Sequence, residues 1–159
     1  GFRIKRRYLP YYLSRTLDLD EFDQDEVTLR VIMGPQDKAF TAAGRKTFLE
    51  SEYTVTSEFD RMGCRLQREE PLKHIGDGNI AFGSVQVPSH GKPIILLSDR
   101  QTTGGYAKIA TVISVDIPKL VQRKTDHKVR FQAVTVEEAQ QLMQDELHEL
   151  QEFRKQSAV

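Results

Sequence analysis

An alternation of apolar and polar residues over 27–33 (VTLRVIM) is the first clear structural pattern in the chain. Its period of two predicts a strand with one buried face, which Gly34 and Pro35 end. Further short apolar stretches are predicted strands: 53–56, 64–67, 80–87, 94–97, 109–115 and 129–134. Many short strands separated by turns predict a mainly β fold, either a sandwich or a barrel.

Two of these strands are predicted to form a hairpin. The residues between 84–87 and 94–97 are Pro-Ser-His-Gly-Lys-Pro, which is typical of a turn. Gly91 lies within this turn and is available for a positive φ angle.

Helix signals are fewer, and the clearest lies near the C-terminal end. Thr135 and Glu138 form a capping box, which predicts a helix over 135–153. Its apolar residues recur on one face, and we expect this face to pack along the outside of the β fold or against another copy: Val136, Ala139, Met143, Leu147 and Leu150. Shorter helices are predicted at 37–49, with a break near Gly44, and at 118–122, with Asp116 as the cap.

Composition narrows the class of protein. The chain has 159 residues, with 23 Lys+Arg against 23 Asp+Glu, which is the size of one globular domain with its own core. Its single cysteine, Cys64, excludes an intramolecular disulfide and is predicted to be a small core residue. No apolar run approaches the ~20 residues that a membrane span needs, so we expect a soluble, cytoplasmic protein with no membrane partner.

Charge is distributed unevenly near the start. Five Arg and Lys residues lie within 3–15, and six acidic residues follow within 18–26. We therefore divide the chain into a charged leading segment, 1–26, and a folded part, 27–159. Tyrosines within the basic stretch could stack on the bases of a single nucleic-acid strand. Pairing with the acidic neighbour is the preferred interpretation, and the balanced overall charge predicts no nucleic-acid partner.

Three segments carry residues that core packing does not explain. The strongest is 98–112, in which Gly104 and Gly105 allow close approach of the backbone to a ligand. Its polar residues are Asp99, Arg100, Gln101, Thr102, Thr103, Tyr106 and Lys108. Residue chemistry alone favours a solvated β-turn, because a Gly-Gly turn is common.

The other two segments are shorter. Asp60, Arg61 and Arg65 lie close to Gly63, where a local salt bridge at a turn is the simplest interpretation. Gln86 is predicted to face opposite to its valine neighbours, either toward solvent or toward a bound carbonyl or amine.

Taken together, these segments resemble one family. The residues that carry the resemblance are RVIMGPQ (30–36), YTVTSEFDRMGCRL (53–66), IAFGSVQVPSHGKPIILLSDRQTTGGYAKIATV (80–112) and VRFQAVTVEEA (129–139). They are similar to the biotin-dependent carboxyltransferase family, which includes the second subunit of allophanate hydrolase, one of the 5-oxoprolinase subunits and the Kip-type antagonist of a kinase inhibitor. The resemblance covers only the second half of the family's domain. Ala107, Cys64 and the loop 125–127 depart from the family pattern.

The resemblance implies a cyclophilin-like β-barrel flanked by a few helices. It also implies amide chemistry: bacterial stand-alone members form part of an ATP-dependent 5-oxoprolinase, which opens the 5-oxoproline lactam to glutamate. The DRQTTGGY motif favours this branch over the urea carboxylase/amidolyase branch. A Kip-type regulatory binding protein stays an alternative that the sequence does not separate. A peptidyl-prolyl isomerase is suggested by the barrel alone.

The resemblance further implies roles for site residues. Catalytic roles, as anchors of a substrate carboxylate or as orienting groups, fall to Asp60, Arg61, Arg100 and Lys108. Substrate-binding roles fall to Gln86, Asp99, Gln101, Thr102, Thr103, Gly104, Gly105 and Tyr106. We expect Asp60, Arg61, Gln86, Arg100, Gln101, Thr102 and Tyr106 to converge in one surface depression.

No cofactor or metal site is predicted within the chain itself. It contains no G-x-x-x-x-G-K-[ST] loop and no persuasive set of metal ligands, so ATP and Mg²⁺ are expected to bind elsewhere in the full assembly. Expected partners are the missing first half of the domain, further 5-oxoprolinase subunits and a small-molecule amide substrate. The isolated chain is expected to be inactive and to self-associate through faces that the first half would cover.

Overall fold

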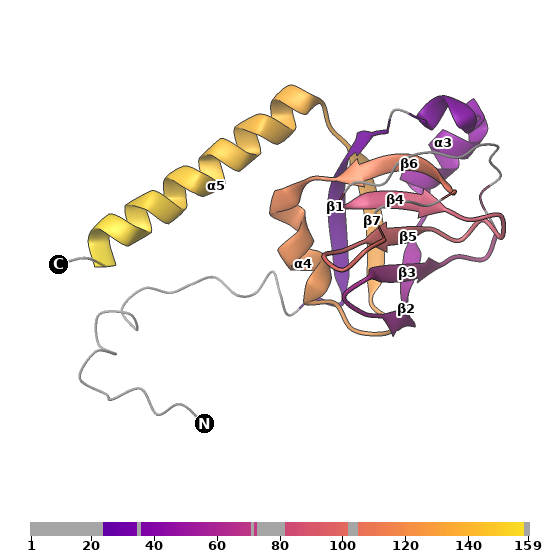
Figure 1. Cartoon of the computed structure of the whole chain (residues 1–159), viewed down its shortest axis with the longest axis horizontal. Helices are drawn as coiled ribbons and strands as arrows, with labels where there is room; N and C mark the ends of the chain where they lie inside the picture. Colours follow the sequence, from indigo (N-terminus) through magenta and orange to yellow (C-terminus); the bar gives the residue numbers. More distant parts are fainter. Residues whose placement is uncertain (1–23, 35, 71, 73–81, 102–104, 158–159) are drawn as a thin grey trace.

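Seven short strands form the body of the molecule. The computed structural model describes residues 24–34, 36–70, 72, 82–101 and 105–157, so most of the leading segment 1–26 lies outside the described residues. Figure 1 shows the strands gathered into one barrel. They are β1 (Glu26–Met33), β2 (Tyr53–Phe59), β3 (Gly63–Gln67), β4 (Ser84–Val87), β5 (Ile94–Leu96), β6 (Ala107–Val112) and β7 (Lys128–Ala133).

The barrel is closed in the order β1-β6-β4-β5-β3-β2-β7. Closure depends on β1, which pairs with β7 in parallel from Glu26↔Lys128 to Val31↔Ala133 and with β6 in the antiparallel sense. The other neighbouring strands are also antiparallel. A closed sheet leaves no unpaired edge. The predicted β-barrel is therefore confirmed.

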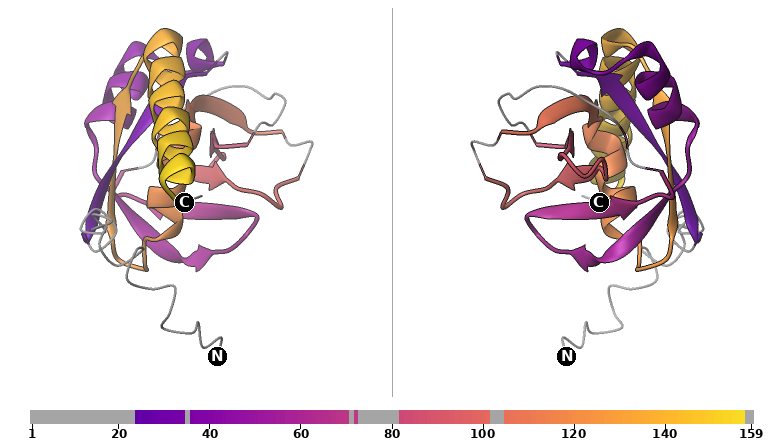
Figure 2. Two further views of the ribbon diagram at one scale, coloured as in Figure 1. Left: turned by 90° about the vertical axis from the view of Figure 1, so that its left-hand side faces the viewer. Right: turned by 90° about the vertical axis from the view of Figure 1, so that its right-hand side faces the viewer.

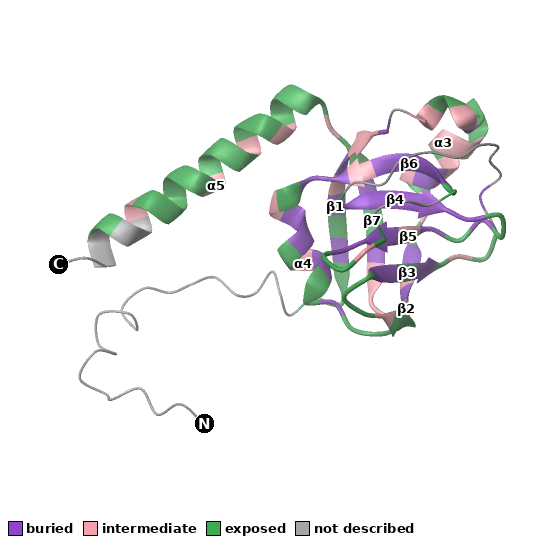
Figure 3. Ribbon diagram, viewed as in Figure 1, coloured by how far each residue is buried: buried purple, intermediate pink, exposed green. Residues whose placement is uncertain are grey.

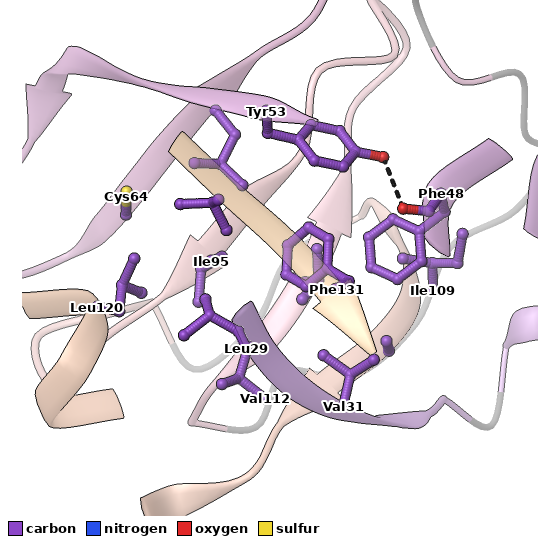
Figure 4. Close-up of a cluster of buried hydrophobic side chains, with 14 of the residues drawn as sticks. Leu29, Val31, Phe48, Tyr53, Cys64, Ile95, Ile109, Val112, Leu120 and Phe131 are labelled. Atoms are coloured by element: carbon purple, nitrogen blue, oxygen red, sulfur yellow. Dashed lines mark hydrogen bonds between the residues drawn. The ribbon is translucent and has the colours of Figure 1, made fainter. Parts of the chain in front are cut away.

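The core fills the barrel and the space beneath α3 (Ala42–Glu50) (Figure 3). Phe48 of α3 stacks on Phe131 of β7, with ring centroids 4.5 Å apart. The Tyr53 hydroxyl donates a hydrogen bond to the Phe48 carbonyl at 3.1 Å (Figure 4). Cys64 is fully buried in the same cluster, and burial raises the pKa of its thiol to about 12. It is the core residue that the sequence predicted.

Three strand predictions had limits that were wrong by three residues or more. The strand predicted at 53–56 is β2, which continues to Phe59, and local geometry explains the other two. The strand predicted at 80–87 starts only at Ser84, because Gly83 has a φ of 77° and its backbone bridges Leu96 and Val112; residues 80 and 81 lie outside the described part. The strand predicted at 109–115 is β6, which ends at Val112 because the 3-10 helix η3 (Ser114–Asp116) follows. The β4–β5 hairpin is confirmed, as is a positive φ, 74°, at Gly91.

The helix predicted at 37–49 breaks earlier than expected. It comprises the 3-10 helix η2 (Asp37–Ala39) and α3, so the break lies at Phe40 and not near Gly44. Thr41 causes it, since its Oγ1 caps α3 by accepting a hydrogen bond from the Gly44 N–H at 3.0 Å. Arg45 Nη1 fixes the same corner by donating to the carbonyls of Asp37 and Phe40.

Asp116 precedes α4 (Ile117–Val121), as predicted, but its side chain does not cap that helix. The fully buried carboxylate instead accepts hydrogen bonds from Arg30, from the backbone N–H and Nε at 2.8 Å and from Nη2 at 2.5 Å. Burial by itself would raise the pKa of Asp116, but the bonds and charge of Arg30, with Lys119 3.5 Å away, outweigh it and hold the pKa below its usual value. This pair ties α4 to β1.

The C-terminal helix α5 (Val136–Ser157) has the predicted capping box: the Glu138 N–H donates to Thr135 Oγ1 at 3.1 Å, and the Thr135 N–H donates to Glu138 Oε2 at 2.7 Å. Its predicted packing along the barrel is wrong. The helix projects from the barrel in Figure 1 and lies in front of it in the left view of Figure 2. Leu147 and Leu150 are 49% and 56% exposed. Among the described helices, none combines the length and apolarity that a bilayer crossing requires.

Replacing Asp116 with alanine is expected to lower the free energy of unfolding by about 3 kcal/mol, because removing one member of a buried ion pair leaves the other without its counter-charge. Urea denaturation followed by circular dichroism measures this. Glu50→Ala is the control, since Glu50 forms an exposed pair with Lys46 at 3.9 Å; a change below about 1 kcal/mol is expected.

The wild-type protein and Asp116→Ala also test how the stability depends on pH. The folded pKa of Asp116 is lowered, so its stabilisation is present above the unfolded pKa of about 4 and is lost as the pH falls through the folded value. The difference in unfolding free energy between wild type and Asp116→Ala should therefore shrink only in acid. A difference that stays constant down to about pH 2 would contradict the proposed charge pairing.

Candidate functional site

The β2–β3 turn and the loop after β5 lie side by side at one end of the barrel. The Leu97 N–H donates to the Met62 carbonyl at 3.0 Å, and the Asp99 N–H donates to the Arg61 carbonyl at 2.9 Å. Segments that are about 40 residues apart in the sequence thus meet through backbone hydrogen bonds. The predicted convergence of these two segments is confirmed.

A cavity of about 670 Å³ opens beside this junction. It collects residues from β2, β3, β4, β5 and the loop that leads to β6. Its lining comprises Ser57, Glu58, Phe59, Asp60, Met62, Gly63, Arg65, Gln86, Ile94, Leu96, Arg100, Gln101, Gly105 and Tyr106. Six of these were predicted site residues: Asp60, Gln86, Arg100, Gln101, Gly105 and Tyr106.

Gln86 is the most unusual residue of the cavity. It lies on β4 opposite Ile94 of β5 and Lys108 of β6, and only 5% of it is exposed. Its side-chain Nε2 is buried and has no hydrogen-bond acceptor within the described part of the chain. A buried amide donor without a partner costs about 1–3 kcal/mol. A ligand that offers an oxygen atom at this wall of the cavity would satisfy it.

Arg100 supplies the positive charge. Its Nη1 donates to the Leu97 carbonyl at 3.3 Å, and its guanidinium carbon lies 5.5 Å from the centre of the Phe82 ring. These contacts hold the side chain in the lining of the cavity. A guanidinium has five N–H donors, and the bond to Leu97 engages one of them. The geometry therefore suits recognition of a carboxylate or phosphate oxygen.

Asp60 has a structural task that the sequence did not indicate. Its Oδ1 accepts hydrogen bonds from the backbone N–H groups of Met62 at 2.8 Å and Gly63 at 3.1 Å. This carboxylate therefore holds the β2–β3 turn. The local salt bridge between Asp60 and Arg61 that the sequence suggested does not form, because Arg61 pairs with Asp99. Asp60 also lines the cavity, so contact between its side chain and a ligand stays a prediction.

Arg61 and Asp99 do not line the cavity. They form an ion pair with each other, with Arg61 Nε 2.9 Å and Nη2 3.2 Å from the two Asp99 carboxylate oxygens. Both side chains are exposed, and Arg61 faces an adjoining cavity of about 440 Å³ with Phe82. The expectation that Arg61 shares one depression with the others is wrong, because Asp99 holds it on the far side of the turn.

Lys108 lies beside Gln86 in the β4–β6 ladder, but it is 3% exposed and its side chain does not line the cavity. Its backbone N–H donates to Gln36 Oε1 at 3.2 Å. An anchoring role for Lys108 stays a prediction. Thr102, Thr103 and Gly104 lie outside the described residues.

Some residues of the cavity were not among the predicted site residues; the sequence singled out Arg65 beside Gly63 but gave it no role. Arg65 on β3 forms an ion pair with Glu58 at 2.9 Å, and both side chains line the cavity. The signal was present, because Arg65 lies between buried Cys64 and Leu66 and so must face outward. Within the described residues, no group of three or more His, Cys, Asp or Glu side chains is placed to hold a metal ion.

Comparison with known proteins identifies the class. Residues 7–133 match the family described as the carboxyltransferase domain, subdomain A and B. The chain therefore belongs to the carboxyltransferase domain family, as its motifs indicated. The match begins within the leading segment and ends at the last residue of β7.

Two curated relatives share one name, that of a 5-oxoprolinase subunit. The protein from Haemophilus influenzae is 40% identical over 119 residues, which are 72% of this chain and 38% of that protein. The protein from Escherichia coli is 37% identical over 123 residues, which are 74% of this chain and 39% of that protein. The chain thus spans about two fifths of the length of these relatives, in keeping with a resemblance to only part of the domain.

A solved structure supports the fold. The urea amidolyase of K. lactis superposes with a TM-score of 0.69 at 18% identity, over 79% of this chain and 9% of that protein. At this identity the likeness shows the fold alone.

Gln86→Met is expected to raise the free energy of unfolding by about 1 kcal/mol, because it replaces an unpartnered buried amide with an apolar chain of similar length. Gln36→Met is the matched control, since the Gln36 amide oxygen has a partner in the Lys108 N–H; a loss of about 1 kcal/mol is expected. Thermal and urea denaturation of both variants measures the effect. A destabilised Gln86→Met protein would show that the amide has a partner in the free protein.

Proposed function

We propose that the chain is the C-terminal part of a subunit of an ATP-dependent 5-oxoprolinase, which opens the lactam of 5-oxoproline to glutamate. The single observation that carries this proposal is the buried, unpartnered amide of Gln86 in the same cavity as Arg100. The names of the two relatives support the choice of substrate. The chain covers about two fifths of the length of these relatives, so it would form only part of such a subunit.

The chemistry of the cavity fits a small cyclic amide with a carboxylate. The ring carbonyl oxygen accepts a hydrogen bond from Gln86 Nε2, which increases the electrophilicity of the lactam carbon. The free N–H groups of Arg100 bind the carboxylate beside the ring. The apolar side chains of Ile94 and Leu96 in the lining suit the methylene groups of the ring. In this arrangement the chain binds and orients the substrate.

Activation of the lactam requires further components. ATP, with Mg²⁺, supplies the free energy for breaking a resonance-stabilised amide. The sequence has no P-loop, so we propose that the first half of the domain and the partner subunits hold the nucleotide. Because the reaction consumes ATP, we propose a cytoplasmic location. The two relatives are bacterial proteins, so we also propose a bacterial origin.

Two alternatives use the same barrel. A Kip-type regulatory protein would bind a protein partner without turnover, and a urea carboxylase part would carboxylate urea. The likeness to urea amidolyase is at 18% identity and concerns the fold alone, so it does not favour urea as the substrate. An activity assay separates the three possibilities.

The test measures glutamate and ADP formed from 5-oxoproline, ATP and Mg²⁺. We expect no turnover by residues 1–159 alone and turnover after the missing part of the domain and the partner subunits are added. Turnover by the isolated chain above the no-enzyme blank would contradict the division of labour proposed here. A complete assembly that carboxylates urea and leaves 5-oxoproline intact would overturn the choice of substrate.

In the complete assembly, Arg100→Ala is expected to lower kcat/KM for 5-oxoproline by about 10- to 150-fold, the effect of losing one hydrogen bond to a charged group. Arg130→Ala is the matched control, because Arg130 is an exposed arginine that pairs with Glu26 and Glu52 away from the cavity. A change of about twofold or less is expected there. Equal effects of the two substitutions would remove Arg100 from the site.

A further inference from the structure

One face of α5 leaves an apolar surface without a cover in the described structure. We define the α5 stripe as Val136, Ala139, Met143, Leu147 and Leu150, which lie on one face of the helix. The four larger side chains are between 36% and 56% exposed. Figure 3 shows exposed residues along most of the helix. Helices of this kind gain most of their stability from packing such a face, so the stripe is suited to a partner surface.

The stripe continues onto the barrel. A groove of about 640 Å³ separates the start of α5 from the barrel wall. The first three stripe residues, Val136, Ala139 and Met143, line one side of it, and Ser114 Oγ lies 3.9 Å from Met143 Sδ. The apolar residues of the other wall are Ile32, Phe82, Val112 and Ile113. A helix laid along the stripe would therefore also contact the barrel.

The spacing of the stripe is self-complementary. Its residues are separated by intervals of three, four, four and three, so the pattern is the same when read in either direction about Met143. We propose that a second copy of this chain covers the stripe, with the two α5 helices antiparallel and the two-fold axis at Met143. Val136 then faces Leu150 of the other copy, and small Ala139 faces large Leu147. Each contact occurs twice, as two-fold symmetry requires.

Sterics and side-chain size favour this direction. A parallel pair would place Ala139 opposite Ala139 and leave a gap, which is costly in a helix interface. It would also bring both barrels to the same end, because each barrel lies at the start of its own α5. The antiparallel pair separates the barrels and brings Leu147 and Leu150 of each copy into the groove beside Phe82 of the other. The family match ends at Ala133, so α5 lies outside the matched region, whereas the barrel side of the groove lies within it.

The oligomeric state of the full chain tests the proposal. Sedimentation equilibrium is expected to give twice the chain mass of 18.2 kDa. Leu147→Lys with Leu150→Lys should weaken dimerisation by at least about 100-fold, because each leucine loses its apolar cover. The control adds the same charges to the opposite face through Gln141→Lys with His148→Lys and should stay dimeric. Circular dichroism checks that both variants keep the barrel.

Cross-linking tests the direction. Met143→Cys lies at the two-fold axis and should form a covalent dimer with a short bismaleimide. Leu150→Cys should not, because the two copies of residue 150 are about 21 Å apart in an antiparallel pair. The native Cys64 does not compete, since it is fully buried and burial raises the pKa of its thiol. Cross-linking at both positions would indicate a parallel pair and overturn the proposal.

Other occupants of the stripe give different results. A chain that is monomeric at every concentration tested would overturn the proposal. Residues 1–17 carry five Arg and Lys and no acidic residue, whereas 136–152 carry six acidic residues and no Arg or Lys. If deletion of 1–17 abolishes the dimer, or if a monomer becomes dimeric only after that deletion, the stripe belongs to this basic segment and the proposal is wrong.

Discussion

The parallel pairing of β1 with β7 is the interaction on which the rest of the structure depends. It joins the first and last strands of the barrel and extends from Glu26↔Lys128 to Val31↔Ala133. Without it, the remaining antiparallel strands would form an open sheet with two exposed edges. With it, the loops at one end are held in a fixed ring. The buried bonds between Asp116 and Arg30 strengthen the same region, because Arg30 belongs to β1.

The cavity combines rigid and adjustable parts. Gln86 comes from a strand that is paired on both sides, so its position is fixed by the ladder. Asp60, Arg100 and Tyr106 come from turns and loops at the same end, which a relative can vary without disturbing the barrel. A donor that stays buried without a partner lowers the stability of the free protein. Natural sequences retain such a conflict between stability and structure mainly where function requires it.

Sequence reasoning succeeded where a pattern has a local cause. Alternation in β1, the capping box of Thr135 and Glu138 and the turn at Gly91 each depend on near neighbours in the chain. It failed where a partner that is distant in the sequence determines the position of a side chain. The exposed ion pair with Asp99 holds Arg61 away from the cavity, and the buried pair with Arg30 removes Asp116 from its capping role. Six of the residues to which the resemblance gave site roles line the cavity, but the resembling stretch 129–139 reaches only the start of α5 and did not indicate how that helix packs.

The closure of the barrel also has a consequence for synthesis on the ribosome. β1 is made before both of its neighbours, β6 and β7, which begin only at Ala107 and Lys128. During translation of the roughly seventy residues between β1 and β6, β1, whose apolar residues include Leu29 and Val31, has no native strand to pair with. Long-range pairing of this kind slows folding and leaves strands open to wrong partners. The nascent chain therefore presents β1 as a natural target for chaperones that bind short apolar segments.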